Sequence, residues 1–252
     1  MISIKNVYHH IHGNTILNDI NLDIPDRSIT ALIGPNGAGK STLFSLIARL
    51  QSLQQGSIHI DELDVNHSNS TAIAQKLAIL AQENNIHSRI TVRDLLMFGR
   101  YPHNHGRVQL KDQQIVDQAL QCFELTQLQH RYLSALSGGQ RQRALVAMIF
   151  CQQTKHIILD EPLNNLDMYH ARELMRLLRR LTTEQGLSTI IVVHDINMAA
   201  GYADHIVAMN NGQIIMQGSP EQIITTKNIK SIFNLDAKVI TQHGKPLVIH
   251  HL

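Results

Sequence analysis

The chain begins with an alternation of apolar and polar positions and then changes to short apolar runs. Ile20, Leu22 and Ile24 fall on one face of an extended segment. Residues 29–33 form a mostly apolar run typical of a buried strand, and the glycine-rich segment 34–41 follows at once. After this segment the apolar residues return at helical spacing, which predicts a helix with one buried face formed by Leu43, Phe44, Leu46, Ile47 and Leu50.

The middle of the chain has the pattern of helices. Residues 91–94 resemble a capping box at a helix start, apolar residues recur at helical spacing between 115 and 123, and a further helix is expected over 140–152. Strand character returns at 157–160, and a helix with four regularly spaced leucines follows and stops at Gly186. The pattern therefore predicts a helical segment between two strand regions.

Toward the C-terminus, the hydrophobic pattern predicts a strand at 190–193 and a hairpin over 206–217 that turns at Asn211-Gly212. Strands on both sides of a helical insert predict the α/β class, with all 252 residues in one domain. The expected parts are a core over about 1–85 and 154–218, a helical sub-domain over about 86–153, and a tail over about 219–252 with a small helix-plus-strand appendage.

Composition and charge exclude several classes of protein. A hydrophobic fraction of 43% supports a full core, and 22 basic against 20 acidic residues give a net charge of +2, which predicts no nucleic-acid partner. Two cysteines cannot form a disulfide scaffold, so a reducing compartment is expected. The sequence begins without the pattern of a signal peptide, and no apolar run approaches the roughly 20 residues of a membrane-spanning helix.

The glycine-rich segment has the spacing of a phosphate-binding P-loop, Gly34-x-x-x-x-Gly39-Lys40-Ser41. Glycines let successive backbone N–H groups converge on phosphate oxygens, and the following helix presents its positive end to the same anion. Lys40 is expected to reach the β- and γ-phosphates, and the Ser41 hydroxyl is expected to bind Mg²⁺.

A second constellation is the apolar strand that ends in Asp160-Glu161. Such a strand delivers carboxylates to the carboxyl end of a sheet, where open α/β folds bind ligands. Asp160 is therefore a candidate Mg²⁺ ligand, and Glu161 is a candidate general base for an attacking water.

A third constellation, Leu136 to Arg143, combines a serine N-cap with two glycines at a helix start. This is another anion site. A nucleotide already enclosed by the P-loop of the same chain cannot use it, whereas a nucleotide bound to a second copy can. The sequence therefore indicates a shared site between two copies.

In this order, Gly34–Ser41, Leu136–Arg143, Ile157–Glu161 and His194 resemble the nucleotide-binding subunit of an ABC transporter. The resemblance extends from about Ser3 to Gly218, and the Leu-Ser-Gly-Gly-Gln signature is highly specific. It implies an ATPase with a P-loop NTPase core of the ABC type, a helical sub-domain, an antiparallel β element, and ATP and Mg²⁺ as cofactors. It also implies a head-to-tail homodimer with each ATP between one P-loop and the other signature.

The resemblance assigns roles to individual residues. Gln82 falls at the Q-loop, which senses Mg²⁺ and the γ-phosphate; His194 matches the switch histidine, and Asp167 matches the aspartate that crosses the dimer interface. The implied catalytic set is Lys40, Glu161 and His194, and the implied Mg²⁺ set is Ser41, Gln82 and Asp160. The implied nucleotide contacts are Gly34, Pro35, Asn36, Gly37, Ala38, Gly39, Lys40, Ser41, Thr42, Gln82, Ser137, Gly138, Gly139, Gln140 and Asp167.

Two positions depart from the family pattern. The family usually stacks adenine on an aromatic residue at a position that falls near Ile11, where the neighbours are Tyr8, His10 and His12; the base-stacking residue is left open. Asn164 stands where Ser or Thr is commoner, while Asp167 is in place.

The cargo is suggested by two further stretches. Residues 91–103, with Phe98-Gly99-Arg100-Tyr101-Pro102, are similar to ATPases of importers for iron chelates, haem and cobalamin, and 161–168 are similar to a subset that serves siderophore uptake. The resemblance thus implies the motor of a bacterial ferric-siderophore importer, peripheral on the cytoplasmic face of the inner membrane. Its expected partners are two integral permease subunits and, indirectly, a siderophore-binding protein.

Two alternatives stay open at this point: the same motor with haem, cobalamin or a metal ion as cargo, and a soluble ABC ATPase that acts on ribosomes or nucleic acid. The sixteen histidines add no metal site, because no Cys or carboxylate completes a recognisable closed set. Apart from His194, the clustered histidines are expected on the solvated surface: His9, His10, His12, His103, His105, His250 and His251.

Overall fold

The computed structural model describes residues 1–81, 89–164 and 166–250. Its central layer is a six-stranded sheet in the order β10-β9-β3-β8-β7-β6, in which every neighbouring pair is parallel except β9 with β10. The strands of the fold are β1 (Ile2–Ile11), β2 (Asn14–Ile24), β3 (Ile29–Ile33), β4 (Gln55–Ile60), β5 (Leu63–Asp64), β6 (Leu77–Leu80), β7 (His156–Asp160), β8 (Ser188–Val192), β9 (His205–Asn210), β10 (Gln213–Gly218), β11 (Lys238–Gln242) and β12 (Lys245–Ile249).

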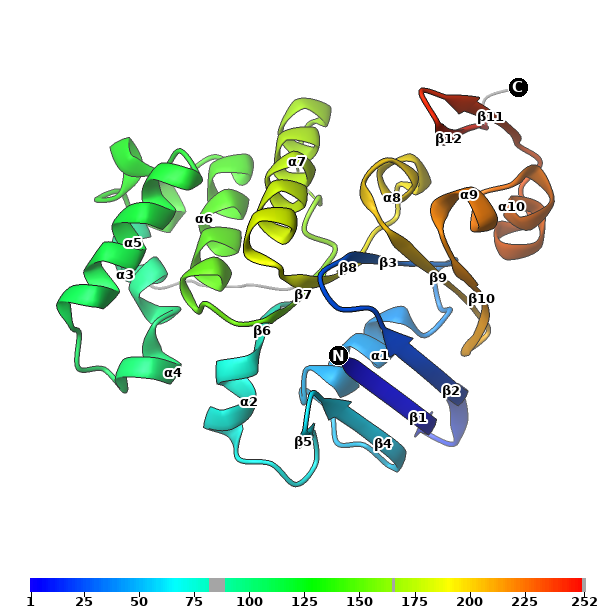
Figure 1. Ribbon diagram of the computed structural model, residues 1–252, viewed down its shortest axis with the longest axis horizontal. Helices are drawn as coiled ribbons and strands as arrows, with labels where there is room; N and C mark the ends of the chain where they lie inside the picture. The colour runs from blue at the N-terminus through cyan, green and yellow to red at the C-terminus, as the bar shows by residue number, and fades with distance from the viewer. Residues whose placement is uncertain (82–88, 165, 251–252) are drawn as a thin grey trace.

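Helices cover the central sheet and extend beyond it (Figure 1). Every residue of β3, β7 and β8 is buried, as expected for parallel strands with both faces covered. The α-helices are α1 (Lys40–Ile47), α2 (Ser70–Lys76), α3 (Val92–Phe98), α4 (Tyr101–Asn104), α5 (Leu110–Cys122), α6 (Gly138–Cys151), α7 (Met168–Gln185), α8 (Ile196–Tyr202), α9 (Pro220–Ile223) and α10 (Thr226–Phe233), with short 3-10 turns at Thr126–Leu128 and Leu133–Ala135.

A second, antiparallel sheet has the order β2-β1-β4-β5 and faces the central sheet across α1. Ile20, Leu22 and Ile24 of β2 are buried and alternate with exposed neighbours, so the predicted face is confirmed. Phe44 of α1 is buried in the same hydrophobic cluster, together with Val192 of the central sheet. One apolar core therefore joins the two sheets and fixes α1 between them.

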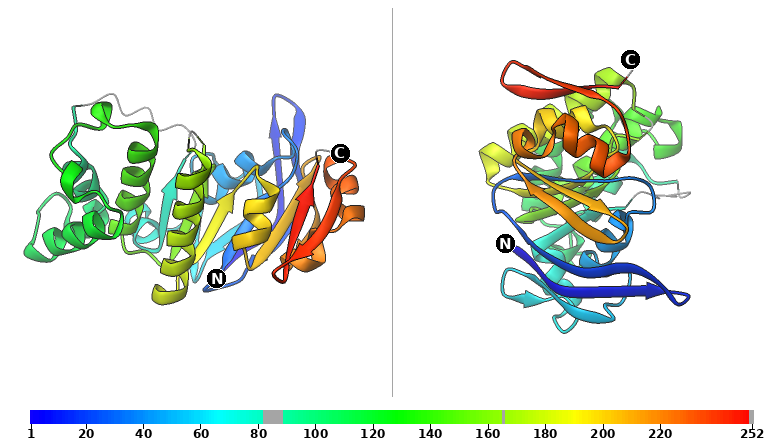
Figure 2. Two further views of the ribbon diagram at one scale, coloured as in Figure 1. Left: turned by 90° about the horizontal axis from the view of Figure 1, so that it is seen from above. Right: turned by 90° about the vertical axis from the view of Figure 1, so that its right-hand side faces the viewer.

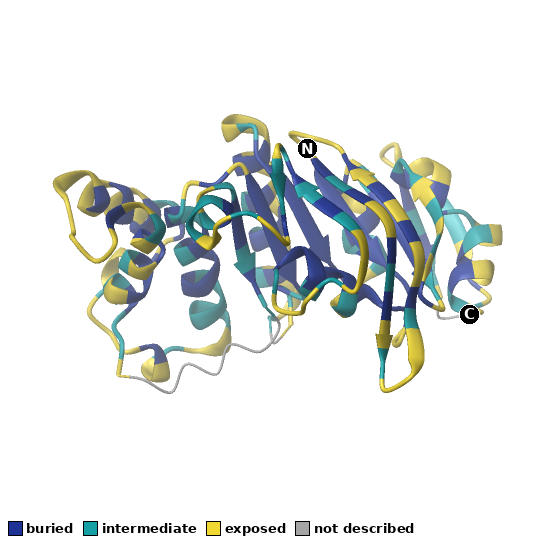
Figure 3. Cartoon of the chain, turned by 90° about the horizontal axis from the view of Figure 1, so that it is seen from below, coloured by how far each residue is buried: buried dark blue, intermediate teal, exposed yellow. Residues whose placement is uncertain are grey.

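Helices α3 to α6 gather at one end of the molecule, and the β11–β12 hairpin lies at the other (Figure 2). Each expected helix of the middle segment is present; α6 begins at Gly138, two residues before the expected start, because Ser137 caps it. Figure 3 shows the buried residues concentrated on the central strands and the exposed residues on the outer sides of the surrounding helices and strands. The α/β class with added helices and an antiparallel element is thus confirmed.

Two local features differ from the hydrophobic pattern. The expected buried position of Leu50 is wrong: α1 ends at Ile47, Arg49 turns the chain with a φ of 57°, and Leu50 is 59% exposed. Strand β1 lies between β2 and β4 and is not among the predicted strands. Register shifts between Ile4 and His10 interrupt the regular alternation of its residues. Neither feature follows from a periodicity of two or 3.6 residues.

The C-terminal segment forms α9, α10 and the β11–β12 hairpin, so the expected helix-plus-strand appendage is confirmed. The side chain of Asn197 in α8 pairs with the backbone of β12: its Nδ2 donates to the Val248 carbonyl at 3.1 Å, and its Oδ1 accepts from the Val248 N–H at 2.8 Å. Across the described ranges, no helix has the length and apolar character that crossing a membrane requires.

Candidate functional site

Four candidate residues lie at or beyond the carboxyl ends of neighbouring parallel strands of the central sheet. They are Lys40, Asp160, Glu161 and His194. Strands β3 and β7 flank β8 in matching register, with Leu32 and Asp160 both opposite Val192. The P-loop leaves β3, Glu161 follows β7, and His194 follows β8. The strand ends therefore bring the P-loop lysine, both acids and the histidine to one place, the usual ligand edge of an open α/β sheet.

Two glycines of the P-loop, Gly34 and Gly39, occupy positions where a side chain does not fit. Gly34 has a φ of 150°, and a Cβ atom there would lie 2.2 Å from the carbonyl oxygen of Met209. Gly39 has a φ of 95°, and its Cβ would lie 2.7 Å from Leu17 Cδ2. The loop can therefore turn backbone N–H groups toward an anion at the start of α1. The other predicted contacts lie in the same turn or the first turn of α1: Pro35, Asn36, Gly37, Ala38, Ser41 and Thr42.

Lys40 is the first residue of α1, and its side chain lies back over its own loop. Its Nζ donates to the carbonyl oxygens of Gly34 at 2.9 Å and Pro35 at 3.0 Å. Burial lowers the pKa of Lys40, and the carboxylates of Glu161 and Asp160 oppose this shift. Because neutral carbonyls are weak acceptors compared with phosphate oxygens, this ammonium can gain by moving to a phosphate.

Asp160 ends β7 as a buried carboxyl group. Burial, and then the adjacent Glu161 carboxylate, raise the pKa of Asp160 to about 6, although Lys40 and His194 act in the opposite direction. Its Oδ1 atom is buried and accepts no hydrogen bond from the described residues. A buried carboxylate oxygen that lacks a protein donor fits a site for a bound cation.

Glu161 has both carboxylate oxygens engaged by side chains from the same edge. Oε1 lies 2.6 Å from His194 Nε2, and Oε2 accepts from Asn164 Nδ2 at 2.6 Å. The side chain of Glu161 is 8% exposed, whereas that of His194 is 46% exposed. The contact with Asn164 has no signal in the sequence beyond the departure from Ser or Thr at this position, because the contact depends on the turn that follows β7.

The Leu-Ser-Gly-Gly-Gln motif lies at the start of α6. Ser137 Oγ accepts from the Gln140 N–H at 3.3 Å, and Gln140 Oε1 accepts from the Ser137 N–H at 3.1 Å. These two bonds form a capping box, and Gly138 and Gly139 begin the helix. Helix α6 packs into the cluster on one face of the central sheet, while α1 packs into the cluster on the other face. The P-loop and the Leu-Ser-Gly-Gly-Gln motif thus belong to different layers of the fold.

The segment before α7 lies against the motif of α6. A Cβ at Gly139 would be 3.5 Å from Leu166 Cδ2, and Asp167 caps α7 by accepting from the His170 N–H at 2.8 Å. Hydrogen bonds from the backbone and then the side chain of His170 lower the pKa of Asp167. Met168 is 87% exposed beside this cap. The predicted Q-loop residue, Gln82, lies outside the described residues.

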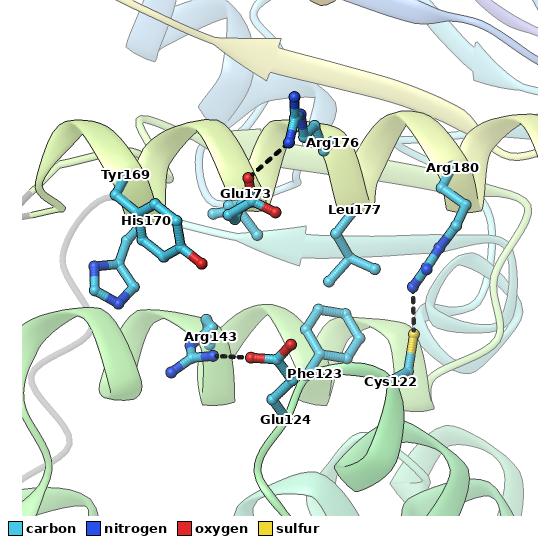
Figure 4. A pocket seen from close by; sticks show the side chains of 11 residues that line it. Cys122, Phe123, Glu124, Arg143, Tyr169, His170, Glu173, Arg176, Leu177 and Arg180 are labelled. Atoms are coloured by element: carbon cyan, nitrogen blue, oxygen red, sulfur yellow. Dashed lines mark hydrogen bonds and ion pairs between the residues drawn. The ribbon is translucent and has the colours of Figure 1, made fainter.

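A cavity of about 430 Å³ separates α6 and the end of α5 from α7 (Figure 4). Arg143 of α6 donates to Glu124 at 3.1 Å, and Arg180 of α7 donates to the Cys122 sulfur at 3.7 Å across the junction. Leu177 supplies an apolar part of the lining. These contacts join α6 and α7, each separately, to the end of α5.

The segment 91–103, which resembles ATPases of chelate importers, contains both buried and exposed residues. Gly99 is tightly packed, since a Cβ there would lie 2.2 Å from the Met148 carbonyl oxygen, and the Arg100 side chain is only 4% exposed. In contrast, Phe98 is 61% and Tyr101 is 57% exposed. Gly99 and Arg100 therefore hold the helices together, and the two aromatic residues form an outer surface.

The expectation of solvated surface histidines is wrong for His9, which is 5% exposed because it points inward from β1 opposite Leu17. His10, His12, His103, His105 and His250 are exposed, and His251 lies outside the described residues. Near the open base-stacking position, Ile11 ends β1, and Leu17 of β2 contacts the P-loop at Gly39.

Comparison with known proteins identifies the family. The sequence model described as ABC transporter matches residues 17–164. The chain is 44% identical to the petrobactin import ATP-binding protein YclP of Bacillus subtilis, with 96% of both chains covered. The chain belongs to the ABC transporter family. It is 42% identical to the petrobactin import ATP-binding protein FatE of Bacillus anthracis, covering 99% of this chain and 100% of FatE. It is also 38% identical to the ferric enterobactin transport ATP-binding protein FepC of Escherichia coli, covering 93% of this chain and 88% of FepC.

Solved structures of ABC proteins have the same fold. An ABC transporter in an inward-facing conformation matches with a TM-score of 0.84 and 25% identity, covering 98% of this chain and 96% of the other. The cbiO1 subunit of Clostridium perfringens matches with a TM-score of 0.80 and 27% identity, covering 92% and 95%. The chain is therefore an ATPase of the ATP-binding cassette type, and it binds nucleotide as members of this ABC family do.

Proposed function

We propose that the chain is the ATP-hydrolysing motor of a bacterial ABC importer for ferric siderophores. The observation that carries the motor function is the convergence of Lys40, Asp160, Glu161 and His194 at the P-loop edge of the sheet. The cargo is supported by the relatives, whose names specify import of petrobactin and ferric enterobactin.

The phosphates of ATP would lie on the turn Gly34 to Thr42. Lys40 would exchange the carbonyl oxygens of Gly34 and Pro35 for the β- and γ-phosphates, because a charge-assisted hydrogen bond is stronger than one to a neutral carbonyl. The backbone N–H groups of the loop and of the first turn of α1 would hold the remaining phosphate oxygens. Binding would thus use groups that lie at one edge of the central sheet.

Mg²⁺ fits the same edge through the Ser41 hydroxyl and the buried Asp160 carboxylate, with Gln82 as the predicted third residue. The hydrogen-bond acceptor Oδ1 of Asp160, which is buried without a donor from the described part of the chain, supports this assignment. The ion would neutralise charge on the phosphates. A bound cation would also favour the ionised form of Asp160, whose pKa burial raises.

Glu161 would act as the general base. A water between Glu161 and the γ-phosphate would attack the γ-phosphorus as its proton passes to a carboxylate oxygen of Glu161. The bond from the γ-phosphorus to the bridging oxygen of the β-phosphate would break, and ADP would leave with the bonding electron pair. His194, now 2.6 Å from Oε1, would turn its imidazole to the γ-phosphate when ATP is present. Turnover would therefore exchange the contact between Glu161 and His194 for contacts with the substrate.

A second copy would complete each site as a homodimer. Ser137, Gly138, Gly139 and Gln140 would contact the γ-phosphate held by the other P-loop, and Asp167 would cross the interface. This arrangement is supported by the separation of α1 and α6 onto different faces of the sheet. It is also supported by the exposure of Met168 beside Asp167, since an apolar side chain that is 87% exposed gains by being covered.

Two integral membrane permeases would dock on the surface of α3 and α4, which would make the chain a peripheral protein of the cytoplasmic face of the membrane. A cavity of about 500 Å³ there is lined by Met97, Phe98, Tyr101 and Val108 among others. Aromatic residues exposed around such a cavity are typical of protein interfaces. A siderophore-binding protein would act indirectly, through the permeases.

Replacing both Phe98 and Tyr101 by Ala should weaken association with the permeases by about 30-fold, the loss expected for one aromatic anchor. ATP binding by the purified subunit should not change. Co-purification with the permeases measures the first quantity, and nucleotide titration measures the second. Ile215→Ala, an exposed apolar residue of β10, is the matched control and should retain association. Unchanged association of the double variant would contradict this docking surface.

The cargo and the motor can be tested together by uptake of radioactive iron. In cells that lack this chain but keep its transport partners, the natural chain should restore uptake of a ferric siderophore. Lys40→Ala should leave uptake at background and weaken ATP binding by about 10- to 100-fold, since hydrogen bonds to charged phosphate are lost. Lys227→Ala, an exposed lysine of α10, is the control. Restored uptake of haem or cobalamin in place of the siderophore would overturn the cargo, and full activity of Lys40→Ala would overturn the motor site.

A further inference from the structure

The carboxylate of Glu161 is held from two sides by residues of different segments. His194, beyond β8, contacts Oε1, while Asn164, in the turn after β7, donates its side-chain amide to Oε2 at 2.6 Å. The same turn is closed by a backbone hydrogen bond from the Asn164 N–H to the Glu161 carbonyl at 3.2 Å. Glu161 itself has a φ of 50°, and its N–H donates to Val192 at 3.2 Å. The backbone of the turn thus places the Asn164 side chain beside the carboxylate.

We propose that Asn164 is a positioning residue, whose amide anchors Oε2 of Glu161 and leaves Oε1 to receive the proton of the attacking water. This inference rests on the proposed role of Glu161 as general base. An amide N–H donates to the carboxylate but has no titratable proton, so Asn164 orients Glu161 without competing for the proton. When His194 turns to the γ-phosphate, the bond from Asn164 keeps the carboxylate plane fixed.

The length of the side chain matters for this function. A serine at position 164 would end at Oγ, one atom nearer the backbone than the Nδ2 of asparagine, and would not reach Oε2 from the same turn. An aspartate has the shape of asparagine but, when ionised, can only accept hydrogen bonds. Variants at this one position therefore separate the effect of the donor from the effect of shape.

The test is steady-state hydrolysis by the transporter assembled with its membrane subunits. Asn164→Ala should lower kcat by about 10- to 100-fold, in line with the effect of a small misplacement of a catalytic group, while the KM for ATP changes by less than about twofold. Asn164→Asp should lose as much activity as Asn164→Ala, and Asn164→Gln, which keeps the amide donor, should recover part of the loss. Asn66→Ala, an exposed asparagine in the loop before α2, is the matched control and should keep its kcat.

The decisive comparison is made in a Glu161→Gln background. If Asn164 acts only through Glu161, Asn164→Ala should cause no further loss there, because two residues that act as one unit are not additive. An unchanged kcat in Asn164→Ala, or an equal fold-loss in both backgrounds, would overturn the inference about Asn164 alone. Undiminished hydrolysis in Glu161→Gln itself would instead overturn the general-base assignment and this inference with it. Wild-type melting temperatures of the variants would exclude loss of folding as the cause.

Discussion

Glu161→Gln should lower the rate of ATP hydrolysis by about 10²- to 10⁴-fold while ATP still binds. Glutamine preserves the shape of the largely buried Glu161 side chain, but its amide cannot accept the proton that the attacking water must lose. ATP should therefore hold two copies together without being consumed. Steady-state hydrolysis measures the first effect, and gel filtration with ATP should show an accumulated dimer.

Glu184→Gln provides the matched control, because Glu184 is an exposed residue in the last turn of α7. It should hydrolyse ATP at the wild-type rate and should form no long-lived dimer. Normal hydrolysis by Glu161→Gln would remove Glu161 from the role of base. Loss of hydrolysis together with loss of ATP binding would indicate instead that the substitution disturbs the P-loop edge as a whole.

The parts of the fold that sequence predicts well are those decided by neighbouring residues. The run 29–33 is apolar enough to be a fully buried strand, and Gly34 to Ser41 follow it with a spacing that serves phosphate binding. The place of Asp160 at the ligand edge could be expected because it ends an apolar strand. His194 was implied by the resemblance to the ABC family, and it reaches the same edge because it follows β8, the parallel neighbour of β7.

The parts that sequence misses depend on contacts between distant segments. The burial of His9 follows from the packing of β1 against β2 and β4, and no local pattern distinguishes this histidine from an exposed one. The bond between Asn164 and Glu161 depends on the left-handed backbone of Glu161, which an L-residue seldom adopts. Arg100 belongs to a motif that suggested a partner surface, but its side chain points inward because it pairs with the Asp112 carboxylate of α5.

Arg100→Met should lower the free energy of unfolding by about 3–5 kcal/mol at neutral pH, because it leaves the Asp112 carboxylate buried without a cation. Arg100 Nε donates to Asp112 Oδ1 at 2.9 Å, and Nη1 donates to the Cys151 carbonyl at 2.6 Å, so one side chain joins α4, α5 and the end of α6. The two side chains are 4% and 5% exposed. Urea denaturation followed by circular dichroism measures the loss.

The pH dependence of this loss identifies its cause. Burial acts to raise the pKa of Asp112, but the bonds from Arg100, Gln109 and Asn104 prevail and lower it. A lowered folded-state pKa gives stability that is present above the unfolded value of about 3.9 and is lost as the pH falls through the folded value. In Arg100→Met burial of Asp112 is no longer opposed by a cation, so its folded-state pKa should rise. The deficit relative to wild type should shrink as the pH falls from the raised pKa of the variant to the lowered pKa of the wild type.

Two further variants separate the buried pair from charge in general. Arg100→Met combined with Asp112→Leu should recover much of the stability, because replacing a whole buried ion pair by apolar groups costs far less than removing one partner. Arg176→Met removes a cation that lies 3.0 Å from Glu173 on α7 but is 57% exposed, and should change stability by no more than about 1 kcal/mol. If Arg100→Met lowered the free energy of unfolding as little as Arg176→Met, an apolar side chain of similar volume would be sufficient at position 100. The role of Arg100 in the importer-like motif would then lie outside the packing of the helices. A large loss that the double variant reverses would show that Gly99 and Arg100 serve the interior, which leaves Phe98 and Tyr101 as the part of the motif that a membrane partner can contact.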